Sequence, residues 1–255
     1  MPELRYNLIS REWVIIARER AKRPKDFSKP LKDKIALPEF KKDCPFCPGN
    51  EDKTPPETFR LQDKNSWRVR VTSNKFPALS PEEKHDRVMK GMFRSMSGFG
   101  VHEVIIDHPR HNAFIPFLSE KEIADIISVY RQRHCAIQQI EHIEAIVIFK
   151  NHGAQAGTSL EHPHSQLIAT PIVPPQIRSR FDRSTHYFDE TGRCIFCQTL
   201  EEELAAGERI VTQTSQFVSF IPYAELSPFH IWIFPRRHCA SFADIQDKEI
   251  DDLAR

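Results

Sequence analysis

Hydrophobic and polar positions along the chain predict several short strands. Runs that are β-branched, or that alternate apolar with polar residues, predict strands at residues 13–16, 68–71, 101–106, 146–149 and 167–170. The last two runs flank a loop that contains Gly153 and Gly157. This loop is therefore predicted to join one strand to the next.

A helix is predicted to begin directly after Ser119. Ser119 and Glu122 have the spacing of a capping box, in which each side chain accepts a hydrogen bond from the other residue's backbone N–H. Apolar residues then follow the helical period at positions 123, 126, 127 and 130. Residues 174–193, by contrast, are rich in proline, arginine and serine and are predicted to form a linker.

The same order of features begins again in the second half of the chain. A strand precedes both His111 and His238, and Lys-Glu-Ile follows each histidine at the same distance. A Cys-x-x-Cys pair opens each half. Chance similarity of a few residues is the alternative, but the shared order favours an internal duplication into units 1–178 and 179–255. The counterpart of His162 would lie near position 289, so we expect the second unit to be incomplete and the chain to be truncated.

Composition excludes several classes of function. The 36 basic and 35 acidic residues give a net charge of +1, which provides no overall attraction to nucleic acid or to an anionic membrane. No run of about 18 apolar residues exists, and the N-terminus lacks an apolar signal region. The absence of both features predicts a cytoplasmic protein. The 40% of hydrophobic residues are enough for a packed core, so we expect a globular fold.

Four of the six cysteines form two Cys-x-x-Cys pairs, Cys44 with Cys47 and Cys194 with Cys197. In a reducing compartment such pairs indicate metal sites or redox sites. The first pair is bracketed by prolines and follows a lysine-rich loop, whereas a thioredoxin-like motif opens a helix after a strand. The pattern therefore favours zinc, which takes four tetrahedral thiolate or imidazole ligands.

Histidines are the expected remaining zinc ligands. His162 is the natural third ligand of the first site, and His108 and His111 are candidates for the fourth. His111 is preferred because His238 occupies the matching place in the repeat. The same reasoning predicts a second, incomplete zinc site of Cys194, Cys197 and His238.

The loop that ends in His162, His164 and Gln166 carries the candidate reaction chemistry. On an extended backbone these three side chains face the same way. Since His162 is assigned to metal, His164 is left as a candidate nucleophile toward phosphorus, and the Gln166 amide can donate to a phosphate oxygen. Backbone N–H groups can cradle a diphosphate; the residues expected to provide them are Gly157, Thr158 and Ser159.

Two weaker signals lie earlier in the chain. Arg20 and Arg23 concentrate positive charge that can bind phosphates, although this segment taken alone is better explained as a solvated basic loop. Asn74 follows a predicted strand, where it can recognise a ribose or a base.

Four motifs together resemble the galactose-1-phosphate uridylyltransferases and the related nucleotide-sugar phosphorylases, of the histidine-triad superfamily. They lie at residues 20–24, 44–49, 73–79 and 157–166, and the last, Gly-Thr-Ser-Leu-Glu-His-Pro-His-Ser-Gln, is the most specific. The resemblance implies an α+β fold of tandem histidine-triad-like units with antiparallel sheets and flanking helices. It also implies a homodimer that binds nucleotide sugars and hexose 1-phosphates.

The implied reaction belongs to galactose metabolism and is a ping-pong transfer of UMP from UDP-glucose to galactose 1-phosphate. By resemblance His164 is the nucleophile, Gln166 stabilises the adduct, and zinc is held by Cys44, Cys47, His111 and His162. The nucleotide contacts implied are Arg20, Arg23, Asn74 and residues 157–159.

Two departures from the best-known uridylyltransferases leave the substrate open. Residues 174–177 lack a glutamate that holds a second metal, and the pair Cys194 and Cys197 resembles the two-zinc branch that includes ADP-glucose phosphorylases. The alternative is therefore an adenylyl-transferring phosphorylase with phosphate as acceptor. A zinc-knuckle module for nucleic acid is a further alternative, against which stand the net charge and the lack of an aromatic stacking series.

Overall fold

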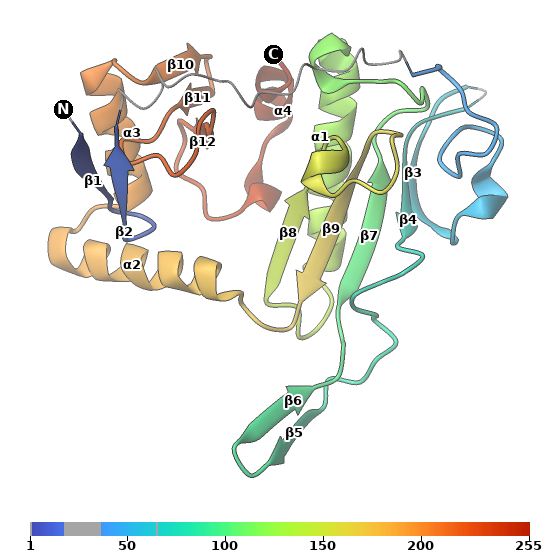
Figure 1. The fold of residues 1–255 in the computed structure, drawn as a ribbon, viewed down its shortest axis with the longest axis horizontal. Helices are drawn as coiled ribbons and strands as arrows, with labels where there is room; N and C mark the ends of the chain where they lie inside the picture. Colours follow the sequence, from blue (N-terminus) through green and yellow to red (C-terminus); the bar gives the residue numbers. More distant parts are fainter. Residues whose placement is uncertain (1, 18–36, 65) are drawn as a thin grey trace, which may run out of the picture. The chain divides into compact units, whose positions relative to one another are not determined.

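The computed structural model describes residues 2–17, 37–64 and 66–255 (Figure 1). It divides into two compact units, each built from two stretches of the chain. We call the described residues of 35–173 and 241–255 the large unit, and those of 1–34 and 174–240 the small unit. The boundaries of these compact units therefore differ from those of the predicted repeat units, 1–178 and 179–255.

A five-stranded antiparallel sheet forms the centre of the large unit. Its order is β3-β4-β7-β9-β8, and its strands are β3 (Glu57–Gln62), β4 (Trp67–Ser73), β7 (Val101–Ile106), β9 (His164–Thr170) and β8 (Ala145–Phe149). The predicted strands in this part of the chain are confirmed, as is the strand-to-strand loop between β8 and β9. The two pairings of β9 place the histidine motif at the entry to an interior strand.

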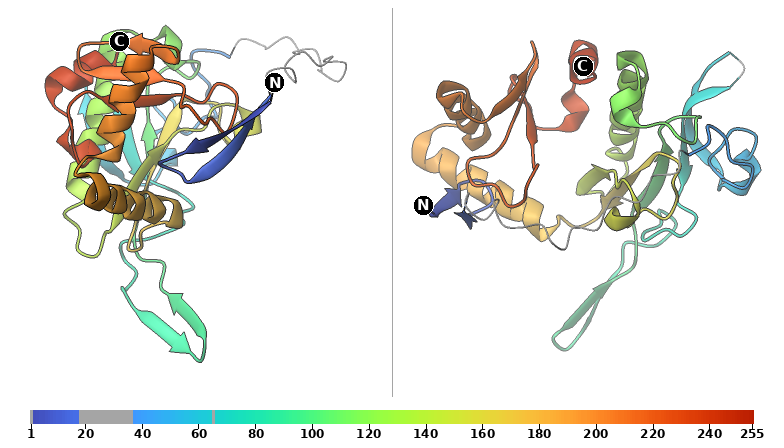
Figure 2. Two further views of the ribbon diagram at one scale, coloured as in Figure 1. Left: turned by 90° about the vertical axis from the view of Figure 1, so that its left-hand side faces the viewer. Right: turned by 45° about the horizontal axis from the view of Figure 1, so that its top comes forward.

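Helix α1 (Glu120–Ile137) covers one face of this sheet (Figure 2). Its predicted capping box is confirmed: the Glu122 carboxylate accepts from the Ser119 N–H at 2.7 Å, and the Ser119 hydroxyl accepts from the Glu122 N–H at 3.3 Å. The core beneath the helix includes Ile126, Val129, Ile105 and Leu167. Burial of each such aliphatic side chain contributes about 1.5–3 kcal/mol.

The other face of the sheet, which we call the open face, carries the histidine motif. Along β9, Ser165, Leu167 and Ala169 are fully buried, whereas His164, Gln166 and Ile168 are half-buried. Strand residues alternate between faces, and Leu167 and Ala169 belong to the core under α1. His164 and Gln166 consequently lie together on the open face.

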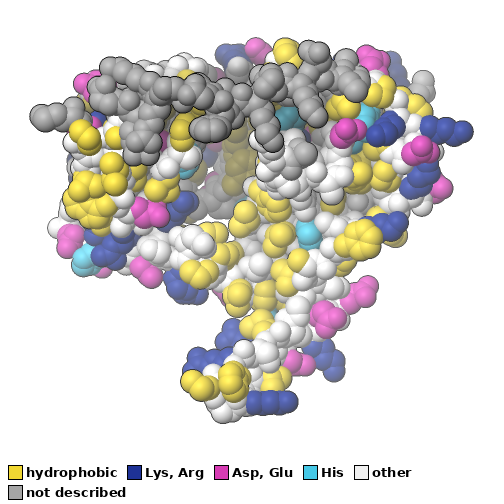
Figure 3. Space-filling model, in the orientation of Figure 1, with side chains coloured by type: hydrophobic (Ala, Val, Ile, Leu, Met, Phe, Trp, Pro, Cys, Tyr) yellow, Lys and Arg dark blue, Asp and Glu magenta, His cyan; other side chains and the backbone are white. Residues whose placement is uncertain are grey.

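Several smaller elements complete the large unit. Helix α4 (Asp247–Leu253) packs beside α1, with the Arg131 guanidinium 2.7 Å from the Asp247 carboxylate, and follows η5 (Phe242–Asp244). The hairpin of β5 (Arg87–Lys90) and β6 (Phe93–Met96) projects from the sheet, and hydrophobic and basic side chains gather on it (Figure 3). Short 3₁₀ turns form at η2 (Glu51–Lys53), η3 (Ile115–Phe117) and η4 (Ala154–Ala156).

The small unit combines helices with two antiparallel sheets. They are the hairpin β1 (Glu3–Asn7) and β2 (Glu12–Ile16), helices α2 (Pro175–Thr191) and α3 (Ile195–Ala206), and strands β10 (Ile210–Gln213), β11 (Phe217–Phe220) and β12 (Trp232–Pro235). Leu200, Val218 and Phe220 form its core with Phe234.

The predicted α+β class is confirmed. In the described part of the chain, no helix combines the length and apolar character needed to cross a membrane.

The prediction of a linker at residues 174–193 was wrong, because most of this segment is helix α2. Pro175 occupies the first helical turn, where a missing N–H costs nothing and the fixed φ suits the helix. Phe181 and Phe188 recur at helical spacing among the arginines. Gly192, with φ of 69°, ends the helix in the left-handed conformation.

Candidate functional site

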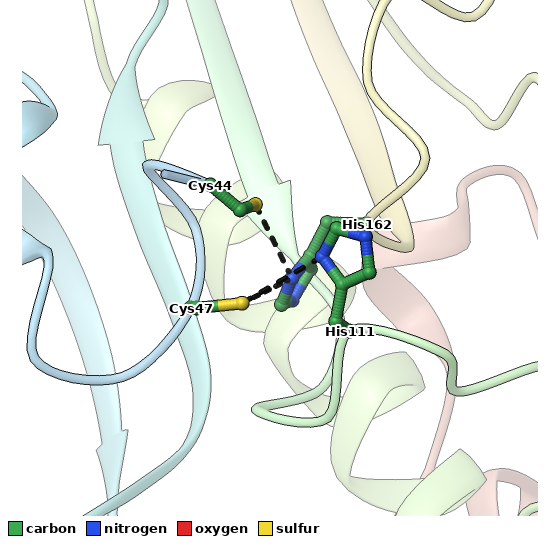
Figure 4. A group of neighbouring side chains, drawn as sticks. All are labelled: Cys44, Cys47, His111 and His162. Carbon is green, nitrogen blue, oxygen red and sulfur yellow. Dashed lines mark hydrogen bonds between the residues drawn. The ribbon is translucent and has the colours of Figure 1, made fainter. Parts of the chain in front are cut away.

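Two cysteines and two histidines of the large unit converge on one point (Figure 4). Cys44 Sγ lies 3.7 Å from His162 Nδ1, and Cys47 Sγ lies 3.6 Å from the Nδ1 atoms of both His111 and His162. A tetrahedral zinc ion with bonds of about 2.3 Å to sulfur and 2.0 Å to nitrogen places such atoms about 3.5 Å apart. All four side chains are buried, so the donor set and the geometry both fit a structural zinc ion.

Tight turns position the two cysteines. The Cys47 N–H donates to the Cys44 carbonyl at 3.3 Å, and the Asn50 amide donates to the same carbonyl at 2.8 Å. Gly49 has φ of 86°, which glycine adopts without strain. The Lys41 N–H also points at Cys47 Sγ at 3.4 Å, a contact that favours the thiolate. The proline-bracketed segment thus presents both sulfur atoms inward.

A chain of hydrogen bonds links the cap of α1 to His162. His108 Nδ1 accepts from the Arg110 N–H at 3.0 Å, so His108 Nε2 carries the hydrogen that the Glu122 carboxylate accepts at 2.9 Å. The His108 carbonyl in turn accepts from His162 Nε2 at 2.8 Å. This bond leaves the lone pair of His162 on Nδ1, the atom that faces the cysteines. His108 is therefore not a member of the cluster but orients His162 through its carbonyl.

Burial controls the ionisation of this cluster. Desolvation lowers the pKa of His162 to about 4, so its imidazole is neutral at pH 7. Burial also raises the pKa of the Cys47 thiol. A divalent cation favours loss of the thiol proton and supplies the positive charge that a pair of thiolates requires.

His164 begins β9, two residues beyond the cluster. Its Nδ1 lies 2.8 Å from the His162 carbonyl oxygen, which can only accept. Nδ1 therefore carries the hydrogen, and Nε2 has a free lone pair. The Phe46 ring packs edge-on against His164, with centroids 5.4 Å apart, and also against His162. Phe46 thus connects the turn that carries the two cysteines to both His162 and His164.

A buried ion pair supports the backbone of His164 and was not found from the sequence. The Lys150 ammonium pairs with the buried Asp107 carboxylate and donates to the His164 carbonyl at 3.3 Å. The Ser165 hydroxyl donates to the same carboxylate at 3.1 Å. A lysine directly after a strand is commonly an exposed residue, so the pattern alone gave no signal of this role.

Gln166 lies two residues further on the open face, where the fold also brings Asn74. The Asn74 amide nitrogen is 3.5 Å from the Gln166 amide oxygen. In the preceding loop Gly157 has φ of 82° and the Thr158 hydroxyl is buried without a hydrogen-bond partner among the described residues, while Ser159 is exposed. Arg20 and Arg23 lie outside the described residues.

Cys194, Cys197 and His238 form a second cluster, in the small unit. Cys194 is the N-cap of α3, and Cys197 Sγ lies 3.1 Å from His238 Nδ1. The two cysteines are half-buried and His238 is exposed. Burial still raises the pKa of Cys197 to about 11. Among the described residues, three donors lie within reach of one ion, which fits a metal site.

Comparison with known proteins gives a consistent result. The family model described as galactose-1-phosphate uridyl transferase, N-terminal domain, matches residues 1–174. An ADP-glucose phosphorylase of Arabidopsis thaliana is 39% identical, with 99% of this chain and 71% of the relative covered. A galactose-1-phosphate uridylyltransferase of Thermotoga maritima is 30% identical, with coverage of 100% and 73%. The crystal structure of an ADP-glucose phosphorylase from Arabidopsis thaliana with bound ADP-glucose superposes with a TM-score of 0.80 at 36% identity, covering 100% of this chain and 74% of that one.

Proposed function

The chain belongs to the galactose-1-phosphate uridylyltransferase family, and on this premise we propose that it is a nucleotidyltransferase that works through a covalent nucleotidyl-histidine at His164. The single observation that carries the proposal is the hydrogen bond from His164 Nδ1 to the His162 carbonyl, at 2.8 Å. It orients the ring and leaves Nε2 on the open face as the nucleophile.

The proposed reaction has two displacements at one phosphorus atom. His164 Nε2 attacks the α-phosphorus of a nucleoside-diphosphate hexose, a nitrogen–phosphorus bond forms, and the bond to hexose 1-phosphate breaks. A phosphate oxygen of the acceptor then attacks the same phosphorus, and the imidazole leaves as the neutral ring. In both steps the Gln166 amide donates to a nonbridging oxygen, where negative charge develops. The nucleotide is held by contacts with Asn74, Arg20, Arg23 and the backbone of residues 157–159.

Zinc is the metal proposed for the cluster of Cys44, Cys47, His111 and His162. When bound it supplies a rigid tetrahedral anchor for segments that are distant in sequence. Cys44 and Cys47 fix the loop that carries Phe46, and His162 fixes the entry to β9. The smaller cluster of the small unit is proposed as a second zinc site.

Two substrate pairs remain as alternatives. The first is UDP-glucose with galactose 1-phosphate, in galactose metabolism, and the second is ADP-glucose with inorganic phosphate. A specific observation favours the second, because identity is 39% to an ADP-glucose phosphorylase and 30% to a uridylyltransferase. A cytoplasmic location and a homodimer stay predictions.

Adduct formation tests the reaction and the choice of substrate. Zinc-loaded protein is incubated with UDP-glucose or ADP-glucose, and its intact mass is measured for a gain of one UMP or one AMP. The His164→Asn variant is expected to form no adduct, whereas His186→Asn, at an exposed histidine of α2, retains it. The adduct is then offered galactose 1-phosphate or phosphate. Absence of an adduct with both sugars would contradict the proposal.

A further inference from the structure

His102 on β7 makes a contact with Gln166 that fixes the state of both side chains. The backbone N–H of Ala78 points at His102 Nδ1 at 3.1 Å. A backbone N–H only donates, so Nδ1 carries no hydrogen and the imidazole hydrogen sits on Nε2. His102 Nε2 lies 2.8 Å from the Gln166 amide oxygen, to which it donates.

Asn74 approaches the Gln166 amide oxygen from a second side. Its side-chain oxygen accepts from the Phe76 N–H at 2.9 Å, so its amide nitrogen is the end that faces His102 and Gln166. That nitrogen lies 3.5 Å from the Gln166 amide oxygen, to which it donates. It also lies 3.0 Å from His102 Nε2, but since both of these nitrogens carry hydrogen, that distance is a contact between two donors and not a hydrogen bond. Two donors thus converge on one acceptor. A flipped Gln166 would place its own N–H groups against both donors and leave no acceptor among the three.

We propose that His102 is a positioning residue that orients the Gln166 carboxamide for nucleotidyl transfer. The register supports this assignment: Val104 lies opposite Gln166 and Ile106 opposite His164, so His102 shares their face of the sheet. Among the described residues, the Gln166 amide nitrogen has no hydrogen-bond partner, and it is turned away from His102. It is therefore available to donate to a phosphoryl oxygen beside His164. This inference rests on the proposed function.

Loss of His102 affects the reaction through Gln166. The terminal torsion of glutamine is broad and roughly two-fold, so nothing intrinsic to the side chain selects one amide orientation. Without the His102 donor, part of the population presents the amide oxygen to the anionic phosphate. Repulsion then replaces a hydrogen bond at the point where charge develops.

A double-mutant cycle separates this role from simple support of the fold. The His102→Phe variant is expected to slow adduct formation about 10- to 100-fold with little change in the half-saturating substrate concentration. His102→Gln, which can still donate, is expected to recover most of this loss. In a Gln166→Ala background, His102→Phe is expected to change the rate less than about two-fold. Full, additive losses in both backgrounds would overturn the proposal.

A second measurement needs no substrate. Long-range proton–nitrogen correlation spectra of the histidine rings report which nitrogen carries the hydrogen. We expect His102 as the Nε2–H tautomer in the wild-type protein, and a change of the Gln166 side-chain amide signals in His102→Phe. An Nδ1–H tautomer would overturn the inference. A correct tautomer with no adduct from any nucleotide sugar would instead contradict the proposed function.

Discussion

The two Cys-x-x-Cys clusters begin from the same four-residue motif and reach different structures. Cys44 and Cys47 lie in turns bracketed by prolines, are buried, and meet His111 and His162. Cys194 instead caps helix α3, and the cluster that it forms with Cys197 and His238 has three donors and is partly exposed. The motif alone therefore specifies two thiols in proximity, whereas the surrounding fold decides burial and the number of ligands.

Removal of one thiol from each cluster gives the largest expected contrast. Cys47→Ser is expected to lower the free energy of unfolding in zinc-containing buffer by about 4 kcal/mol or more, because it leaves a buried set of ligands incomplete. Cys197→Ser, in the partly exposed cluster, is expected to cost less than half as much. Denaturant unfolding with metal analysis measures both. Equal losses would show that the two clusters contribute alike.

Acid is expected to act on the buried cluster in metal-free protein. The pKa of His162 is about 4 in the folded chain against an ordinary value of 6.5, so between these values the unfolded chain binds more protons. The contribution of His162 to the free energy of unfolding is therefore fully present above about pH 6.5. It is lost as the pH falls to about 4, which lowers the free energy of unfolding by roughly 3 kcal/mol. Denaturant unfolding across this range measures the slope, which His162→Gln should reduce. An unchanged slope in that variant would contradict the assignment.

The two clusters are expected to lose metal in a fixed order. A chelator is expected to remove metal from the cluster of Cys194, Cys197 and His238 first, with an affinity at least about 10-fold weaker than that of the four-ligand cluster. Thiol modification followed by peptide mapping should label Cys194 and Cys197 before Cys44 and Cys47. Simultaneous labelling of the two pairs would contradict the difference in burial.

The smallest effect is expected at the cap of α1. Ser119→Ala removes the hydroxyl that accepts from the Glu122 N–H, which costs about 1 kcal/mol of stability. It also loosens Glu122, which holds His108 and through it His162. Metal affinity of the buried cluster should fall by up to about 10-fold, and that of the other cluster should not change. An equal change in the metal affinity of both clusters would exclude this connection between the helix cap and His162.

Local features were predictable from the sequence, and contacts between distant residues were not. The Ser119 cap and the strand 101–106 follow from short-range hydrogen bonding and alternation, so both were predicted correctly. Helix α2 was missed because proline and arginine content outweighed the spacing of Phe181 and Phe188. The convergence of cysteines with His162 was expected from ligand chemistry and from the family resemblance.

The residues that support His164 and Gln166 required the structure. Lys150 and Asp107 are 43 positions apart, and His102 and Gln166 are 64 positions apart. Each pair meets only because β7, β8 and β9 are neighbours in the sheet. His102 occupies a polar position of an alternating strand, a pattern that an exposed residue of no function shares.

The covalent nucleotidyl-histidine is tested by finding which residue of the protein carries the nucleotide. Zinc-loaded protein is incubated with UDP-glucose or ADP-glucose, quenched in alkali, digested, and sequenced by mass spectrometry. One nucleoside monophosphate is expected on His164 in the peptide that spans residues 157–166, formed with at least one of the two sugars. A nucleotide on another residue, or an unmodified peptide under conditions in which the protein turns over substrate, would contradict it.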